Sequence, residues 1–408
     1  VASFYTYDGK YNNPEHPSWG AKDEGRIRSF VEVNGYYDGI GIPLATPLLP
    51  NPARIMEELF SRRTPPNVMK LRKYNRRNSR IMSQLLPYFG EFVARDMSTS
   101  IDNSSDPMHI PCYDDDDEQD EDSSEERIPF SLCRRPGQTK HPFYRSQYTE
   151  GTSRDYPRVP INTKSAFLDL SHIYGHDKDT VRSLRTGVGG EVALSDDDGL
   201  PLRDPKTKQF ITEDPSSRLH PGLFSLVVIF LRHHNFLARK FAETHPDADD
   251  EHLFQLARMQ NIAVYQSIVE EKYLPILLGD TLDPYRGYNP TVNPTIDVFF
   301  ATVAFRYGHS AISGFYPVVD KKYHSIEEYD PLLLRDVFNH TERWVDELAQ
   351  VTRTMEDDKE NNNNEGKNHM SGLEPFLRGL SVESEKHVDV SFVQDLSLIS
   401  TMVSVMNI

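Results

Sequence analysis

Three histidines lie in stretches of the sequence with helical spacing, His233 and His234 in one stretch and His309 in another. Phe305, His309 and Ile312 are spaced so that they share one face of a helix, which places the imidazole on an apolar wall. An imidazole there can bind haem iron through one ring nitrogen while a neighbouring acceptor holds the other. From spacing alone, a hydrogen-bonded core or surface histidine is the simpler interpretation, and the iron ligand is the alternative.

Four stretches with one apolar face predict the helices that would position these histidines. They run over residues 81–98, over the stretch that begins at residue 223 and contains His233, from 251 to about 278, and from 294 to about 312. Gly279 and Gly314 are expected to end the last two helices. The fold class is therefore mainly α, with little β structure.

Other stretches lack this periodicity. Residues 1–55 are rich in Pro, Gly, Tyr and Asn and are expected to form irregular structure over a larger body. Residues 113–127 form a run of Asp and Glu whose charges repel, and residues 355–370 are hydrophilic and rich in Asn. We expect one domain over residues 1–408, interrupted by these two disordered insertions.

The composition excludes two classes of protein. The 408 residues carry 62 acidic and 45 basic side chains, a net charge of −17. A nucleic-acid-binding face needs clustered Lys and Arg, so we expect no nucleic-acid partner. The longest apolar run, residues 223–231, is too short to cross a bilayer core of about 30 Å. No membrane span is expected.

Weak signals favour an exported glycoprotein. The sequence begins at Val1 without a leader, so any secretory signal is expected to have been removed. Asn103 and Asn339 begin triplets that fit the glycosylation acceptor pattern. Cys112 and Cys133 bracket the acidic loop and either form a disulfide, worth about 3 kcal/mol in the chain-entropy model, or remain a reduced, buried pair.

Several local strings, taken together, resemble the animal haem peroxidases. Residues 300–310 read FATVAFRYGHS, like the family's proximal-histidine helix, and residues 89–96 read FGEFVARD, like its distal helix. Residues 165–175 read SAFLDLSHIYG, like its calcium loop, and residues 231–235 read LRHHN, like its core-helix signature. The opening strings YDGKYNN (7–13), WG (19–20), YDG (37–39) and LPNP (49–52) are similar to the peroxidase-homology domain of dual oxidases.

The resemblance implies two cofactors. It makes His309 the proximal ligand of the iron of haem b, and Arg306 the partner of a haem propionate. It also implies a calcium site, for which oxygen ligands are the appropriate chemistry. The calcium ligands would be Asp96, Ser165, Asp169, Ser171 and the carbonyl of Phe167. The alternative is that the same Asp and Ser residues cap a surface helix.

The distal side departs from the family pattern. Arg95 stands where the family has its distal histidine, and a guanidinium cannot accept a proton from peroxide. The catalytic arginine falls at Ser216 by ungapped counting, and Arg218 can substitute only if the loop shifts. The two carboxylates that bind haem covalently in the family fall at Ala94 and Leu219, so we expect any haem to be non-covalent.

An alternative distal arrangement uses Glu91, which takes the place of the family's glutamine and lies four residues before Arg95. Glu91 could move the proton while Arg95 polarises the departing oxygen, similar by analogy of parts to the dye-decolorising peroxidases. A plain surface salt bridge is the other interpretation. The family's asparagine that holds the proximal imidazole lies downstream of the segment at 377–380 and is not seen before Ile408. The C-terminal part of the family domain is therefore expected to be missing.

These features predict a haem-binding, peroxidase-type oxidoreductase with a degenerate distal site. It would use hydrogen peroxide to oxidise an unknown reducing substrate. The alternative is a catalytically silent peroxidase-homology ectodomain that docks with or regulates a membrane NADPH oxidase of the dual-oxidase type, or its maturation factor. A calcium-stabilised adhesion module is a third class. The expected location is the extracellular space or the secretory-pathway lumen.

Overall fold

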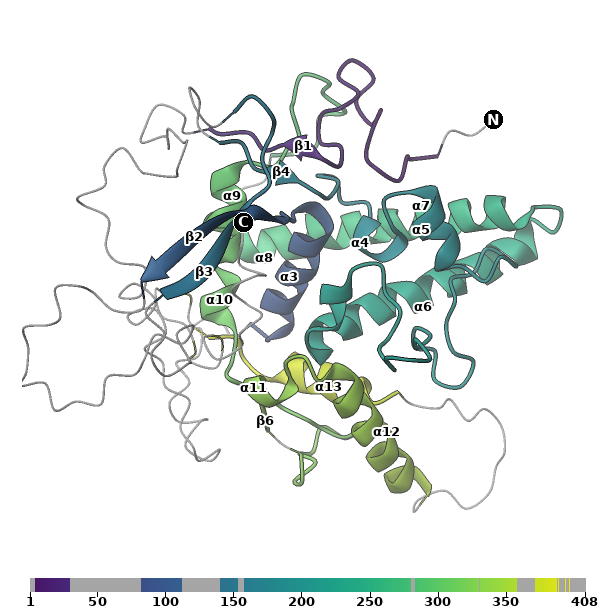
Figure 1. Cartoon of the computed structure of the whole chain (residues 1–408). Helices are drawn as coiled ribbons and strands as arrows, with labels where there is room; N and C mark the ends of the chain where they lie inside the picture. The colour runs from purple at the N-terminus through teal and green to yellow at the C-terminus, as the bar shows by residue number, and fades with distance from the viewer. Residues whose placement is uncertain are drawn as a thin grey trace, which may run out of the picture.

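A computed structural model describes residues 4–29, 82–111, 140–152, 158–279, 283–329, 331–357 and 371–386, together with residues 388, 393 and 396. Figure 1 shows helices at the centre, with the strands arranged around them. The prediction of a mainly α fold is confirmed. Cys112, Cys133, the acidic loop at 113–127 and residues 30–55 lie outside the described residues.

Two helices form the centre of the core. Helix α3 (Leu85–Met97) presents Phe92 to helix α6 (Pro221–Thr244), where it stacks on Phe230 with ring centroids 5.1 Å apart. Helix α6 begins at Pro221. Proline suits the first helical position because the N–H there would have no partner within the helix. The side chain of His220 caps α6 by accepting a hydrogen bond from the backbone N–H of Leu223.

The helix predicted from 251 to about 278 is observed as three consecutive segments. Helix α7 (Asp250–Ile268) continues through a π-helical turn, η4 (Val269–Tyr273), into α8 (Leu274–Leu278). Gly279 ends the run with a φ of +76°, a conformation that suits glycine because it has no Cβ. Asn261 of α7 donates to the carbonyl of Phe230, which fixes α7 against α6.

The prediction of one continuous helix from 294 to about 312 was wrong. The structure has three short pieces: α9 (Val298–Thr302), η5 (Ala304–Arg306) and α10 (Gly308–Ala311). Asp297 caps α9, accepting from the N–H of Phe299, so the helix begins after the predicted start. Val303 then leaves the helical region, at φ −125° and ψ −67°. Branching at Cβ, as in Val303, lowers helix propensity.

The remaining elements surround this core. The strands pair antiparallel as β1 (Glu24–Gly25) with β4 (Ile161–Asn162), β2 (Asp102–Pro111) with β3 (Lys140–Ser146), and β5 (Phe315–Tyr316) with β6 (Leu332–Leu333). The other helices are α4 (Ser171–Tyr174), α5 (Lys178–Ser183), η3 (Pro215–Arg218), α11 (Leu334–Val337), α12 (Thr341–Asp357) and α13 (Glu374–Val382).

Helix α12 corrects one boundary of the predicted insertions. It extends to Asp357, so the first residues of the stretch predicted to be disordered at 355–370 are helical, because the apolar periodicity of α12 continues into it. The rest of that stretch lies outside the described residues. Among the helices that the structure describes, none is long and apolar enough to span a membrane.

Candidate functional site

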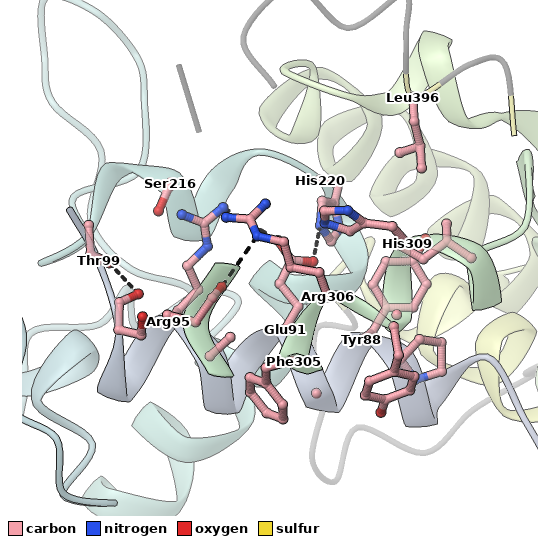
Figure 2. Close-up of a pocket in the computed structure, with 18 of the residues that line it drawn as sticks. Tyr88, Glu91, Arg95, Thr99, Ser216, His220, Phe305, Arg306, His309 and Leu396 are labelled. Carbon is pink, nitrogen blue, oxygen red and sulfur yellow. Dashed lines mark hydrogen bonds and ion pairs between the residues drawn. The ribbon is translucent and has the colours of Figure 1, made fainter. Parts of the chain in front are cut away.

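A cavity of about 420 Å³ lies between α3, the start of α6 and the segment that contains η5 and α10 (Figure 2). The volume falls within the range of about 300–1,000 Å³ typical of ligand pockets. Apolar side chains form much of its wall, namely Phe300, Phe305, Ile312, Leu334, Phe338 and Leu396. His309 and Arg306 line the same cavity, so the structure brings both predicted haem-binding residues together.

His309 is held in its neutral form. Burial lowers the pKa of the imidazole to about 4, and the positive charges of Arg306 and Arg95 act in the same direction. At neutral pH the ring therefore carries a single N–H proton, and the neutral imidazole is the form that binds a metal. The residue sits on α10, a single helical turn at the wall of the cavity.

Arg306 and Arg95 place two guanidinium groups at the other end of the cavity, and Figure 2 shows them pointing toward one another. Burial, reinforced by the charge of Arg95, lowers the pKa of Arg306 to about 10. Arg306 donates from Nε to the carbonyl of Ala301 at 3.4 Å. Arg95 pairs with Glu91 across 3.6 Å, so these two residues share a helix face as predicted.

Glu91 has a second and closer partner, His220. The Nε2 of His220 lies 2.8 Å from Oε2 of Glu91, and its Nδ1 lies 2.9 Å from the hydroxyl of Tyr316. Because Nδ1 also accepts from the backbone N–H of Leu223, the ring proton belongs on Nε2, from which it donates to Glu91. Burial raises the pKa of Glu91, but His220, Arg95 and His309 together lower it to about 2.

His220 lines the cavity and was missed by the sequence reasoning. Its local signal was a histidine directly before the proline that begins the core helix. The partner that reveals its role, Glu91, lies 129 residues away in the chain. Only the packing of α3 against the start of α6 brings these side chains together.

The structure does not bring Arg218 to the cavity. Its Nη1 lies 3.0 Å from Oε1 of Glu342, and the turn η3 holds it away from the cavity wall. Ser216 lines the cavity instead, with its hydroxyl 2.5 Å from Asp214. The loop shift that Arg218 requires is therefore absent, because the guanidinium has a carboxylate partner elsewhere. Ala94 also lines the cavity, whereas Leu219 packs against the hydrophobic core.

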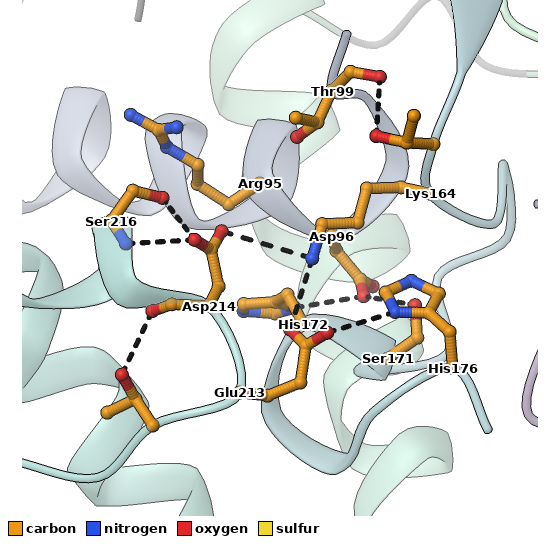
Figure 3. Close-up of polar contacts among 12 residues, drawn as sticks. Arg95, Asp96, Thr99, Lys164, Ser171, His172, His176, Glu213, Asp214 and Ser216 are labelled. Carbon is orange, nitrogen blue, oxygen red and sulfur yellow. Dashed lines mark hydrogen bonds and ion pairs between the residues drawn. The ribbon is translucent and has the colours of Figure 1, made fainter. Parts of the chain in front are cut away.

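Four of the predicted calcium ligands, Asp96, Ser165, Asp169 and Ser171, are buried, and Phe167 is half-buried. Asp96 accepts through Oδ2 from the backbone N–H of Asp169 and of Leu170, each at 3.1 Å. Asp169 accepts from the backbone N–H of Ser171, the first residue of α4, at 3.0 Å, but the N-cap of this helix is Leu170, which makes no side-chain cap bond. Figure 3 shows Asp96 beside Ser171 and His172, whose Nδ1 lies 2.9 Å from the Asp96 carboxylate.

One atom of this cluster lacks a partner that a cation would supply. Asp169 Oδ2 is buried without a hydrogen-bond partner among the described residues. Burial, together with the charge of Asp96, raises the pKa of Asp169 to about 6. Oxygen atoms in this arrangement fit a hard cation such as Ca²⁺. Within the described ranges, no group of three or more His, Cys, Asp or Glu residues is arranged to hold a metal, so such a site would depend on hydroxyl and carbonyl oxygens as well.

A second polar network fixes the turn that carries Ser216 (Figure 3). Lys164 lies 3.1 Å from Glu213 and 4.0 Å from Asp214, and His176 lies 3.1 Å from Glu213. Although burial opposes it, the charges of Lys164 and Arg95 keep the pKa of Asp214 below its ordinary value. This network anchors η3 at the edge of the cavity.

The sequence model of the animal haem peroxidases matches residues 4–398. The chain belongs to this family. It is similar to the dual oxidase of Drosophila melanogaster, with 31% identity over 75% of the chain and 20% of that protein, and to dual oxidase 1 of Homo sapiens, with 31% identity over 73% and 19%. The chain thus spans about a fifth of the length of the dual oxidases it matches.

Solved structures share the fold. Peroxidase A of Dictyostelium discoideum superposes with a TM-score of 0.75 at 22% identity, covering 100% of this chain and 76% of that one. A fatty acid α-dioxygenase of Arabidopsis thaliana gives a TM-score of 0.63 at 15% identity, covering 85% and 54%. Membership of the animal haem peroxidase family implies haem binding, and the neutral imidazole, cationic Arg306 and apolar wall of the cavity fit that group.

Proposed function

We propose that the chain binds haem b non-covalently in this cavity and uses hydrogen peroxide to oxidise a reducing substrate. His309 would bind the haem iron and Arg306 would bind a propionate. The supporting observation is a neutral imidazole and a buried cation on the wall of one apolar cavity. Ala94 and Leu219 carry no carboxyl group, which supports non-covalent binding. Haem would supply the redox-active iron at which peroxide is cleaved.

The chain's own residues would handle the proton that peroxide cleavage moves between the two oxygens. His220 holds Oε2 of Glu91, so Oε1, on the side of Arg95, is the oxygen that would take the proton. With a pKa lowered to about 2, Glu91 is ionised at neutral pH, which is the form that could accept the proton and then return it to the departing oxygen. Arg95 would stabilise the negative charge that develops there. His220 would act as a positioning residue.

We also propose that Asp96, Ser165, Asp169, Ser171 and the carbonyl of Phe167 hold Ca²⁺. The buried Asp169 Oδ2 without a partner among the described residues supports this assignment. The triplets at Asn103 and Asn339 and the similarity to dual oxidases support an extracellular or secretory-lumen location. An NADPH oxidase module or its maturation factor would be the partner.

A second candidate is a catalytically silent domain that docks with or regulates such an oxidase. Arg95, in the place of the family's distal histidine, favours it. The two candidates differ in what peroxide does to the haem-loaded chain, because only a competent distal site speeds its reaction.

The visible absorption spectrum of the purified chain, titrated with hemin, tests the proposal. We expect an intense haem band that shifts on mixing with hydrogen peroxide and that His309→Ala abolishes. His324→Ala, at an exposed position, is the matched control and should retain the band. A folded wild-type chain without a band contradicts haem binding. A band unchanged in His309→Ala contradicts the assignment of His309 as the iron ligand, and a band that peroxide leaves unaltered favours the silent domain.

A further inference from the structure

The connection between helices α11 and α12 carries one of the two triplets that fit the glycosylation acceptor pattern (Figure 1). It consists of Asn339, His340 and Thr341, and Thr341 is the first residue of α12. Asn339 and His340 are exposed, whereas Thr341 is buried, with 0% of its surface exposed. The residue that would carry a glycan therefore lies at the surface, and the hydroxyl that completes the pattern lies inside the protein.

Asn339 has a sufficient reason to be present in the fold. It follows the C-terminal end of α11 with a φ of +63°, which is in the left-handed region. Asparagine tolerates this region better than most residues and sometimes ends helices in this way. Its backbone N–H donates to the carbonyl of Leu219 at 2.6 Å, which fixes the turn. The asparagine alone therefore gives no evidence of a modification.

The hydroxyl of Thr341 has no such reason. Threonine at the start of a helix normally caps it by accepting a hydrogen bond from a backbone N–H. Oγ1 of Thr341 makes no hydrogen bond in the described ranges, so it does not cap α12. A buried hydroxyl without a partner destabilises a fold, and valine has nearly the same shape without that group. The folded structure therefore does not explain this hydroxyl.

The acceptor pattern distinguishes Thr341 from other buried hydroxyl groups. Thr149, Ser217 and Ser313 also lack a hydrogen-bond partner in the part of the chain that the structure describes. None of these three residues has an asparagine two positions earlier in the sequence. Only at Thr341, among the four, does the unexplained hydroxyl coincide with an acceptor triplet.

The triplet at Asn103 lacks this coincidence. Ser105 is exposed, so water can satisfy its hydroxyl. Oδ1 of Asn103 accepts from the backbone N–H of Ser105 at 3.1 Å. The folded chain and solvent account for the polar groups of this triplet, so the structure favours Asn339 as the acceptor.

We propose that Asn339 carries an N-linked glycan and that the Thr341 hydroxyl serves the transferase that attaches it, before the chain folds. The inference rests on the proposed location in the secretory-pathway lumen. In the transfer, the amide nitrogen of Asn339 forms a bond to the anomeric carbon of the sugar and loses one proton. The bond from that carbon to a lipid diphosphate breaks, and the diphosphate leaves.

The glycan would lie beside the cavity without entering it. Phe338, directly before Asn339, and Leu334 of α11 line the cavity, whereas Asn339 is exposed. A bulky, hydrated sugar at this turn would keep the outer face of the α11–α12 connection in water. A protein partner would therefore dock on another face of the chain.

Peptide mass spectrometry of the full chain, secreted from animal cells behind a cleavable leader, tests the site. We expect a peptide-N-glycosidase to release a glycan from Asn339 and to leave aspartate there. Asn339→Gly, which accepts the same φ, and Thr341→Val should each abolish the glycan, and Thr341→Ser, which keeps a hydroxyl, should retain it. Thr352→Val is the matched control and should also retain it. Thr352 is a buried threonine of the same helix whose hydroxyl donates to the carbonyl of Leu348 at 2.9 Å.

The thermal midpoint of the glycosidase-treated chains separates the acceptor triplet from the fold. Thr341→Val should leave the midpoint unchanged or raise it, because it removes an unpaired hydroxyl, whereas Thr352→Val should lower it. A clear fall in Thr341→Val would give the hydroxyl a role in the fold and overturn the inference.

An unmodified Asn339 in the secreted wild type also overturns the inference. Because the leader imposes export, that result contradicts the site and not the proposed location. A glycan at Asn339 behind the leader but not in the chain from its natural source would contradict the proposed location, and the inference would fail with it. Hemin binding is measured independently of either result.

Discussion

The two walls of the cavity differ in how they relate to the animal haem peroxidases. The α10 wall carries His309 and Arg306, the residue types that the family places at these positions, although the predicted helix is broken into short pieces. The α3 wall is the reverse, since the helix is regular but Glu91, Ala94 and Arg95 depart from the pattern. The α3 wall therefore has the regular helix, whereas the α10 wall has the residue types of the family.

Helix α3 explains how this separation is possible. Phe92 and Val93 face the core, and buried Asp96 joins the polar cluster beside α4, whereas Glu91 and Arg95 face the cavity. The buried face alone is enough to hold the helix in place, because apolar burial dominates the stability of such an element. The cavity face can change its chemistry without loss of the fold.

The largest expected effect comes from Glu91→Gln, which changes only the α3 wall of the cavity. If Glu91 moves the proton as proposed, removing its carboxylate should slow the reaction with peroxide by about 10²–10⁴-fold, the contribution typical of a general acid–base group. Hemin binding should remain, because His309 is untouched. Stopped-flow spectroscopy measures the rate. Glu342→Gln, whose carboxylate pairs with Arg218, is the control, and a wild-type rate in Glu91→Gln would refute the assignment.

A second prediction compares a cavity histidine with a core histidine. Burial lowers the pKa of His234 to about 4, the same value as for His309. Between pH 6.5 and 4 the unfolded chain takes up a proton at His234 that the folded chain does not, so stability is complete above pH 6.5 and falls as the pH drops toward 4. The shift corresponds to about 3 kcal/mol.

Denaturant unfolding of the haem-free chain at several pH values measures this loss. His234→Gln should flatten the acid dependence by about that amount. His324→Gln, at an exposed position, should leave the slope as in the wild type. An unaltered slope in His234→Gln would mean that the acid dependence arises elsewhere.

Tyr316→Phe should have a smaller effect on the α3 wall. It removes the hydroxyl 2.9 Å from Nδ1 of His220 but leaves the Leu223 N–H in place, so the tautomer is retained with one hydrogen bond fewer. A neutral hydrogen bond is worth about 1 kcal/mol, so we expect a loss of about fivefold in the peroxide rate, with an altered pH profile. Tyr323→Phe, which is exposed, is the comparison. A loss as large as that of Glu91→Gln would assign Tyr316 a direct part in proton transfer.

The smallest effect is expected for Arg218→Gln. Because Arg218 pairs with Glu342 away from the cavity, the peroxide rate should change by less than about twofold, and the free energy of unfolding should fall by about 1 kcal/mol. Steady-state kinetics and denaturant unfolding measure both. A large loss of rate with intact stability would restore Arg218 to the distal site.

The sequence predicted the parts of the molecule that local periodicity determines. The long helices α6 and α7 were found because their apolar positions repeat over many turns. The break at Val303 was missed because it depends on local caps and branching that a periodic pattern does not register. Strands β2 and β3 were likewise unforeseen.

The site was predictable only where one segment carries the chemistry. His309 and Arg306 lie three residues apart and were found together. The Glu91–His220 pair depends on a contact between distant segments, so no local string contains it.

The double role of His220 places a constraint on how this site can be redesigned. One ring nitrogen accepts from the Leu223 N–H in the first turn of α6 and the other donates to Glu91, so the helix start and the orientation of the Glu91 carboxylate depend on a single side chain. Aspartate would cap the helix well, but it would set a second negative charge beside Glu91. Alanine would leave both the helix terminus and the carboxylate without a partner. A substitution at His220 therefore affects the start of α6 and the Glu91 carboxylate together.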